Sequence, residues 1–148
     1  MKLVRSHNSD PNFLTLVDLL DAALRITDGP DHAFYNQFNG SDTLDVVGLL
    51  LADNVAISCG AYRIKNDSQV EIKRMYTRLS YRKRGCARLI LTALENWATE
   101  DGFSETILET GINQDEALAF YPKMGYQRIP NFEPYIGVKT SICFGKKL

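Results

Sequence analysis

The stretch that decides the fold reads Met75-Tyr-Thr-Arg-Leu-Ser-Tyr-Arg-Lys-Arg-Gly-Cys-Ala-Arg-Leu-Ile90. It leaves a strand pattern, turns through Gly85 and enters an amphipathic helix pattern. Such a turn leaves unpaired backbone N–H groups at the helix start, which together with the helix dipole attract an anion such as a pyrophosphate. Gly85 and the small Ala87 would let phosphates approach the backbone closely. A Walker loop and a dinucleotide fingerprint are both excluded, because the Gly-Lys-Ser/Thr ending and the three glycines are missing.

Strand signals lie on both sides of this stretch. Leu44–Leu51 and Val55–Ile64 flank Ala52-Asp53-Asn54, as in an antiparallel hairpin, and Val70–Thr77 continues the meander after a second turn. The other expected strands are Leu3–Arg5, Thr106–Glu109, Tyr126–Ile129 and Ser141–Lys146.

Four helices are expected between these strands. Asp10-Pro11 begins the first, because aspartate caps a helix and proline suits its first position. Asp31 is expected to cap a second, short helix that runs through Phe38. The third spans Gly85 to about Glu100, and Asn113-x-x-Glu116 resembles a capping box that opens the fourth.

Length and composition indicate one globular domain, residues 1–148, with 45% apolar and 24% charged residues. No apolar run approaches the ~20 residues of a membrane span, and the polar start lacks the apolar segment of a signal peptide. We therefore expect a cytoplasmic protein with no membrane partner. Three widely separated cysteines and two histidines favour a reducing compartment and predict no metal site.

The net charge of −1 hides an asymmetry along the chain. Between Lys73 and Arg88 there are seven basic residues and no acidic one, whereas the remainder carries 10 basic and 18 acidic residues. This basic block favours a local anionic ligand over nucleic acid. A nucleic-acid binder that uses the block is kept as an alternative, and it predicts strongly salt-dependent affinity.

Two motifs resemble those of one family. Arg82-Lys83-Arg84-Gly85-Cys86-Ala87 resembles the Arg/Gln-x-x-Gly-x-Gly/Ala motif of the GCN5-related N-acetyltransferases, the GNAT superfamily. Asn113-x-x-x-Ala117-x-x-Phe120-Tyr121-x-x-x-Gly125-Tyr126 resembles its second signature. The resemblance implies a three-layer α/β (α+β) domain, in which helices flank a mixed, mostly antiparallel sheet of about seven strands. It also implies acetyl transfer from acetyl-coenzyme A, as co-substrate, to a primary amine.

Family roles carry over to individual positions. The resemblance implies that the pantetheine arm lies along Met75, Tyr76 and Thr77, and that Asn113 and Phe120 contact this arm. Tyr121 matches the tyrosine near the coenzyme sulfur, although Pro122 could kink its helix. The residues implied to hold the pyrophosphate and the adenosine end are Arg82, Lys83, Arg84, Gly85, Cys86, Ala87 and Arg88.

Acetylation of an alkylammonium requires a base, because a pKa of ~10.4 makes neutralisation at pH 7 cost about 4.6 kcal/mol. The offset of Glu71 before Arg82 resembles that of the catalytic glutamate in the histone-acetylating branch of the family. A surface carboxylate paired with Lys73 or Arg74 is an equally weighted reading of Glu71. Glu109, at the end of the next strand, is the competing candidate for the base.

The acceptor stays open as a small-molecule amine or a protein amine, and a homodimer is left open as well. The acidic remainder of the chain mildly favours a cationic acceptor. An alternative from another class is a coenzyme A–binding sensor or regulatory module that keeps the Arg82–Ala87 loop and performs no turnover.

Overall fold

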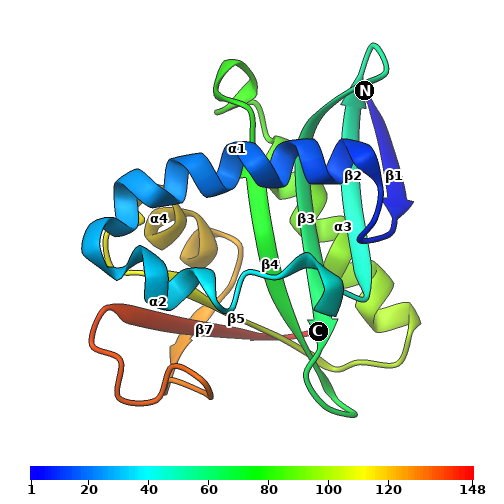
Figure 1. The fold of residues 1–148 in the computed structure, drawn as a ribbon. Coiled ribbons are helices and arrows are strands. Elements are labelled where there is room, and N and C mark those ends of the chain that lie inside the picture. Colours follow the sequence, from blue (N-terminus) through cyan, green and yellow to red (C-terminus); the bar gives the residue numbers. More distant parts are fainter.

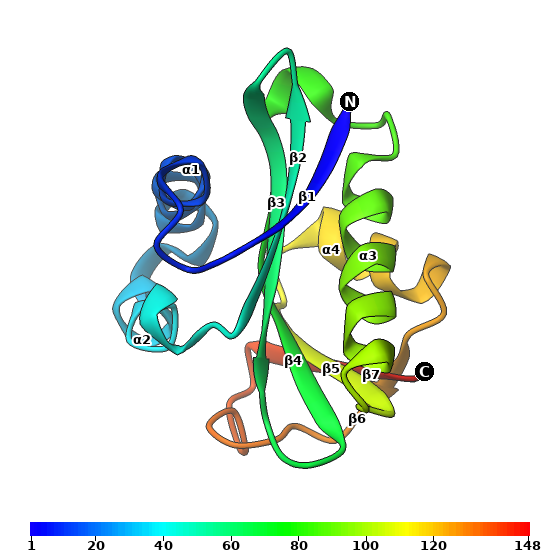
Figure 2. The ribbon, with the colours of Figure 1, turned by 90° about the vertical axis from the view of Figure 1, so that its right-hand side faces the viewer.

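Residues 1–148, described here by a computed structural model, form one seven-stranded sheet between two layers of helices. Figure 1 looks onto the face covered by α1 and α2, and Figure 2 shows the sheet edge-on, with α3 and α4 on the side opposite α1 and α2. The strand order is β1-β2-β3-β4-β5-β7-β6. The three-layer architecture and the number of strands expected from the sequence are confirmed.

Every strand pair is antiparallel except β4 with β5. The turn between β2 and β3 falls on Asp53 and Asn54, which both have positive φ (50° and 64°), as tight hairpins require. The strands are β1 (Lys2–Ser6), β2 (Val46–Ala52), β3 (Val55–Ile64), β4 (Gln69–Thr77), β5 (Glu105–Gly111), β6 (Gln127–Ile129) and β7 (Ser141–Lys147).

The helices are α1 (Pro11–Asp28), α2 (His32–Asn36), α3 (Cys86–Glu100) and α4 (Asp115–Lys123). The prediction for α1 is confirmed, because the Asp10 side chain accepts a hydrogen bond from the backbone N–H of Asn12. The helix buries Phe13, Leu16 and Val17 against the sheet.

Two predicted helix caps are wrong. Asp31 makes no capping hydrogen bond, because it belongs to a short 3-10 turn (Gly29–Asp31) that runs directly into α2. Gln114, not Asn113, precedes α4, and no side chain caps that helix. The helix continues through Pro122 to Lys123, so the proline stands in its last turn, where one missing N–H interrupts little.

The sheet opens in its middle, between β4 and β5. These parallel strands pair only from Gln69 to Glu71 on one side and from Glu105 to Ile107 on the other. Beyond that point the two strands diverge (Figure 1), so the edge of β4 that faces β5 has no strand partner as far as Thr77. An unpaired strand edge can accept an extended ligand as if it were another strand.

A bulge shapes the same part of β4. The register with β3 shifts between Cys59 and Ala61, so that Arg74 and Met75 together oppose Gly60. Arg74 takes up the extra residue with a φ of 58°. A side chain at Gly60 would collide with the Met75 sulfur and lie 2.7 Å from Ile90, so glycine lets β4 and α3 approach β3.

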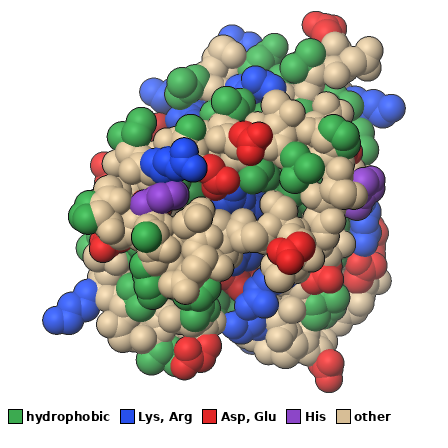
Figure 3. All heavy atoms as spheres, in the orientation of Figure 1, with side chains coloured by type: hydrophobic (Ala, Val, Ile, Leu, Met, Phe, Trp, Pro, Cys, Tyr) green, Lys and Arg blue, Asp and Glu red, His purple; other side chains and the backbone are tan.

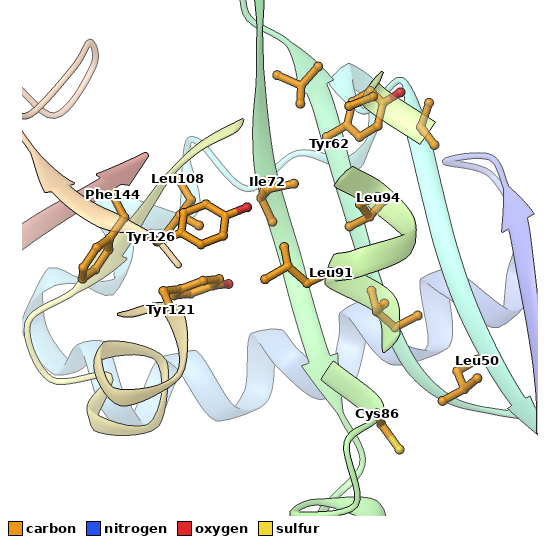
Figure 4. Packing of buried hydrophobic residues seen from close by; sticks show 14 of the residues in the cluster. Leu50, Tyr62, Ile72, Cys86, Leu91, Leu94, Leu108, Tyr121, Tyr126 and Phe144 are labelled. Atoms are coloured by element: carbon orange, nitrogen blue, oxygen red, sulfur yellow. The ribbon is translucent and has the colours of Figure 1, made fainter. Parts of the chain in front are cut away.

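The larger core cluster fills the space between the sheet, α3 and α4. Figure 4 shows Tyr121 and Tyr126 extending toward β4, beside Leu91 of α3. The Tyr126 hydroxyl donates to the Glu95 carboxylate at 2.8 Å, and the Lys146 ammonium donates to the same carboxylate at 3.1 Å. These hydrogen bonds connect α3 to β7 and to the turn that follows α4. Tyr121 belongs to α4.

We expect Glu95→Ala to lower the free energy of unfolding by about 2–3 kcal/mol, since it leaves Tyr126 and Lys146 without their shared acceptor. Urea denaturation measures the change. Glu100→Ala, at an exposed position of the same helix, is the matched control and should shift stability by less than about 0.5 kcal/mol. Equal stabilities of the two variants would contradict this account of the network.

Candidate functional site

The loop before α3 presents a row of free backbone donors. Lys83 and Gly85 both adopt left-handed backbone, with φ of 62° and 80°. None of the backbone N–H groups from Lys83 to Arg88 donates a hydrogen bond within the protein, and the first helical bond is that of Leu89 to Gly85. A side chain at Gly85 would meet no atom within 4 Å, so the space beside this residue of the loop is open. The arrangement fits an anion at a helix start.

Two arginines of this loop lie over aromatic rings. Arg82 donates through Nε to the Thr77 carbonyl at 2.9 Å, and its guanidinium lies 5.5 Å from the centre of the Tyr76 ring. Arg84 lies 5.5 Å from the centre of the Tyr81 ring. Arg88 is exposed in the first turn of α3, and the side chain of Cys86 is buried in the core. The loop therefore offers backbone donors and cations together.

A cavity of about 160 Å³ lies where β4 and β5 diverge, and residues of α1, α2 and α4 line it. It brings together Glu71, Glu109 and Tyr121, the three residues that the sequence suggests for catalysis, with Met75 of β4. A second hollow of about 470 Å³ adjoins it and shares Glu71, Lys73 and Tyr135. In Figure 3, Lys and Arg side chains are set into a depression in the middle of the face that is shown.

Glu71 is not a surface carboxylate. Its side chain is 2% exposed, and it accepts a hydrogen bond from Arg63 Nε at 2.8 Å, with the Lys73 ammonium at 3.9 Å. The expected alternative partner, Arg74, pairs instead with Asp21 of α1 at 2.6 Å. The surface reading is therefore wrong: Glu71 is buried in an ion pair with two cations, and its charge is already compensated.

Glu109 lies in a different environment. Burial in the cavity raises the pKa of its carboxyl to about 7, and the nearby charge of Glu71 adds to the increase. A hydrogen bond from the Ser141 hydroxyl, at 2.6 Å, and the charge of Lys73 act in the opposite direction. No cation lies within ion-pair distance of this carboxylate. A carboxyl with a pKa near 7 can exchange protons at neutral pH.

Tyr121 is 6% exposed, packs edge-on against Phe120 and Tyr126, and lines the cavity. Its hydroxyl makes no hydrogen bond within the protein, which leaves it available to a ligand. Burial raises the pKa of this hydroxyl well above its ordinary value, so it stays protonated and acts as a donor.

Some of the residues taken from the motifs lie outside the cavity. Asn113 is exposed in the turn between β5 and α4, and Phe120 packs against the core. Two further residues, Asp28 and Gln114, line the cavity and belong to neither motif. Asp28 had one signal that could have revealed it: an acidic side chain at the end of a helix opposes the helix dipole, so its presence needs another reason.

The basic block does not form one continuous surface. Arg74 is buried under α1, and the Lys73 side chain is 11% exposed and donates to the carbonyl of Phe38. Two of the seven basic residues therefore point into the protein, away from the loop before α3. None of the helices combines the length and the apolar composition that crossing a membrane would take.

Comparisons with known proteins identify relatives of this chain. Residues 13–126 match the model of a family described as the acetyltransferase (GNAT) family. An IAA acetyltransferase of Azospirillum brasilense is 34% identical over 93 residues, which cover 62% of this chain and 61% of that protein. The chain spans about a third or less of three mammalian N-acetyltransferase 8 relatives.

Solved structures share the whole architecture. An acyl-CoA N-acyltransferase from Klebsiella pneumoniae has a TM-score of 0.83 and 27% identity, and the alignment covers 99% of this chain and 97% of that one. A GNAT family acetyltransferase from Elizabethkingia anophelis, solved with acetyl-CoA bound, has a TM-score of 0.71 and 17% identity over 99% of this chain and 97% of that one.

Proposed function

Because the chain belongs to the acetyltransferase (GNAT) family, we propose that it transfers an acetyl group from acetyl-coenzyme A to a primary amine. The amine attacks directly while both substrates are bound. The observation that supports this most is one cavity, beside an unpaired strand edge, that holds a carboxyl with a pKa near 7 and a free tyrosine hydroxyl.

Acetyl-coenzyme A fits the groups that the chain leaves free. The open N–H groups from Lys83 to Arg88 would hold the pyrophosphate, with Arg82 and Arg84 beside it. The unpaired edge of β4 from Met75 to Thr77 would pair with the amides of the pantetheine arm. When bound, the coenzyme would supply the acetyl group as a thioester; its sulfur would leave as a thiolate and take up a proton from solvent.

Glu109 is the base in this proposal. An acceptor ammonium with a pKa of ~10.4 must lose a proton before it attacks. The pKa of the Glu109 carboxyl, about 7, is roughly 2.5 pKa units above that of an ordinary glutamate, so Glu109 is the stronger base. Glu71 has a different task. It holds Arg63 and Lys73 in place at the boundary between the two hollows.

Tyr121 acts on the leaving group, the coenzyme thiolate, in this proposal. Full transfer of its proton to a thiolate, with a thiol pKa of ~8.5, is uphill because burial raises the pKa of the tyrosine. The hydroxyl instead donates a hydrogen bond that stabilises the developing negative charge on sulfur.

A screen of primary amines with acetyl-coenzyme A, in which released thiol is measured, tests the proposed function. We expect amine-dependent thiol release and an acetylated acceptor detectable by mass spectrometry. Tight coenzyme binding without acetylation of any amine would favour the second candidate, a coenzyme A–binding sensor.

Tyr121→Phe removes one hydroxyl and almost no volume, so the core around Tyr126 should keep its packing. We expect turnover to fall roughly 10- to 1000-fold, with coenzyme affinity changed less than about twofold. Single-turnover kinetics, which isolate the chemical step, provide the measurement. Wild-type turnover in this variant would return Tyr121 to a packing role.

A further inference from the structure

The charged side chains that line the cavity are unevenly paired. Arg74 is neutralised by Asp21, and Glu71 by Arg63 and Lys73. Glu109 and Asp28 are left without a cation at hydrogen-bond distance. Buried carboxylates are normally paired, so two such groups around one cavity indicate a cationic ligand. The proposed reaction accounts for Glu109 alone.

Asp28 is held in the cavity wall rather than in solvent. Its side chain is 7% exposed at the end of α1, and burial raises the pKa of its carboxyl. Its contacts are weak: the Gln114 amide donates at 3.5 Å, and the His32 ring nitrogen lies at 3.9 Å. The nearby carboxylate of Asp31 opposes its ionisation further, and the Asp28 and Glu109 carboxylates repel each other when both are charged. A ligand ammonium group would supply the positive charge and the hydrogen-bond donor that these neighbours do not provide.

Asp28 and Glu109 approach the same face of β5 two residues apart. Oδ1 of Asp28 lies 3.7 Å from the position a side chain would take on Gly111, so this carboxylate covers that residue. Glu109 is two residues earlier on β5 and therefore on the same face, roughly 7 Å along the strand. Leu20 and Leu24 of α1 line the same cavity, providing an apolar wall.

We propose that Asp28 binds a second cationic nitrogen of the acceptor, so that the acceptor is a short aliphatic diamine. This inference rests on the proposed function. One nitrogen lies at Glu109 and is acetylated, the other pairs with Asp28, and the alkyl chain packs on Leu20 and Leu24. A four-carbon diamine spans five single bonds of about 1.5 Å, which extend to roughly 6 Å. The cavity of about 160 Å³ is below the roughly 300–1,000 Å³ of sites for drug-sized ligands, in keeping with so small an acceptor.

The test compares 1,4-diaminobutane with n-pentylamine, which has the same length and a methyl group in place of the second ammonium. We expect wild-type protein to show at least a tenfold higher kcat/KM for the diamine, after correction for its two equivalent amines. Asp28→Asn should lower kcat/KM for the diamine at least tenfold, mainly through KM. The value for pentylamine, which has no second ammonium, should fall much less, and the midpoint of its pH profile should move down because the charge of Asp28 helps to raise the pKa of Glu109.

Asp18→Asn is the control, because it removes the same charge from an exposed position of the same helix and should leave both amines unaffected. Equal kcat/KM for the two amines in wild-type protein, or equal losses for both in Asp28→Asn, would overturn the assignment of Asp28 and leave acetyl transfer intact.

Calorimetric titration of 1,4-diaminobutane in the presence of coenzyme A separates the two proposals. If neither amine is acetylated, but the diamine binds and Asp28→Asn weakens binding at least tenfold, Asp28 is a diamine-binding residue and the proposed catalysis fails. If the diamine does not bind, the inference about Asp28 is wrong.

Discussion

Replacing Gly85 with valine is expected to weaken acetyl-coenzyme A binding by roughly 100-fold. The added side chain would occupy open space in the loop whose N–H groups, from Lys83 to Arg88, are unpaired. A pyrophosphate could then no longer reach those donors, and charge-assisted hydrogen bonds of this kind contribute about 1.5–3 kcal/mol each. Isothermal titration calorimetry with acetyl-coenzyme A gives the affinity directly.

Gly102→Val is the matched control for this prediction. Gly102 has a φ of 93°, close to the 80° of Gly85, and a side chain there would also meet no atom within 4 Å. Both variants therefore carry a similar backbone strain of about 1–2 kcal/mol, but only Gly85 belongs to the loop with the free donors. Unchanged affinity for acetyl-coenzyme A in a folded Gly85→Val protein, or equal losses of affinity in both variants, would refute the assignment of this loop as the pyrophosphate-binding site.

Glu109→Gln is expected to lower turnover at pH 7.5 by about 10²- to 10⁴-fold, because the amide keeps the shape of the side chain and cannot accept the acceptor's proton. In the wild-type protein the Glu109 carboxyl is ionised above its pKa of about 7. Turnover should therefore rise with pH through a midpoint near 7, and the Gln variant should lack this limb. Stopped-flow measurement of thiol release across pH 5.5–9 records both profiles.

Glu71→Gln separates the two candidate bases. It removes the charged partner of Arg63 and Lys73, so we expect lower stability of the folded protein. Turnover of this variant should still rise with pH through a midpoint near 7. If Glu71→Gln abolishes this rise of turnover with pH while Glu109→Gln keeps it, Glu71 is the base, and the proposal of acetyl transfer still holds.

Stability provides an independent readout for Glu109. Its carboxyl has a pKa of about 7 in the folded protein, above the ordinary value of 4.5, so between these values the folded state binds more protons than the unfolded chain. The free energy of unfolding should therefore fall as pH rises through this window. Above pH 7 the Gln variant should be more stable than wild type by roughly 1–3 kcal/mol, as expected when a functional site is strained for activity.

Local patterns were sufficient for most of the secondary structure. The cap at Asp10, the hairpin turn at Asp53 and Asn54, and the turn at Gly85 each depend on residues close in sequence, and the structure confirms them. The Asn113-x-x-Glu116 pattern failed because the chain leaving β5 sets where α4 begins, and Gln114 takes the preceding position. Such a pattern records a local preference that a tertiary constraint can override.

By itself, the sequence determined the family motifs, the order of the elements and the loop that presents free donors before α3. These features follow from residues within a few positions of one another. Only the tertiary structure decided which carboxylate is free. Glu71 and Glu109 stand on neighbouring strands with the same chemistry, yet Arg63 and Lys73 compensate the first, and burial raises the pKa of the second. Desolvation and ion pairing depend on residues far apart in the chain, such as Asp28 of α1 and Gly111 of β5, which no local pattern brings together.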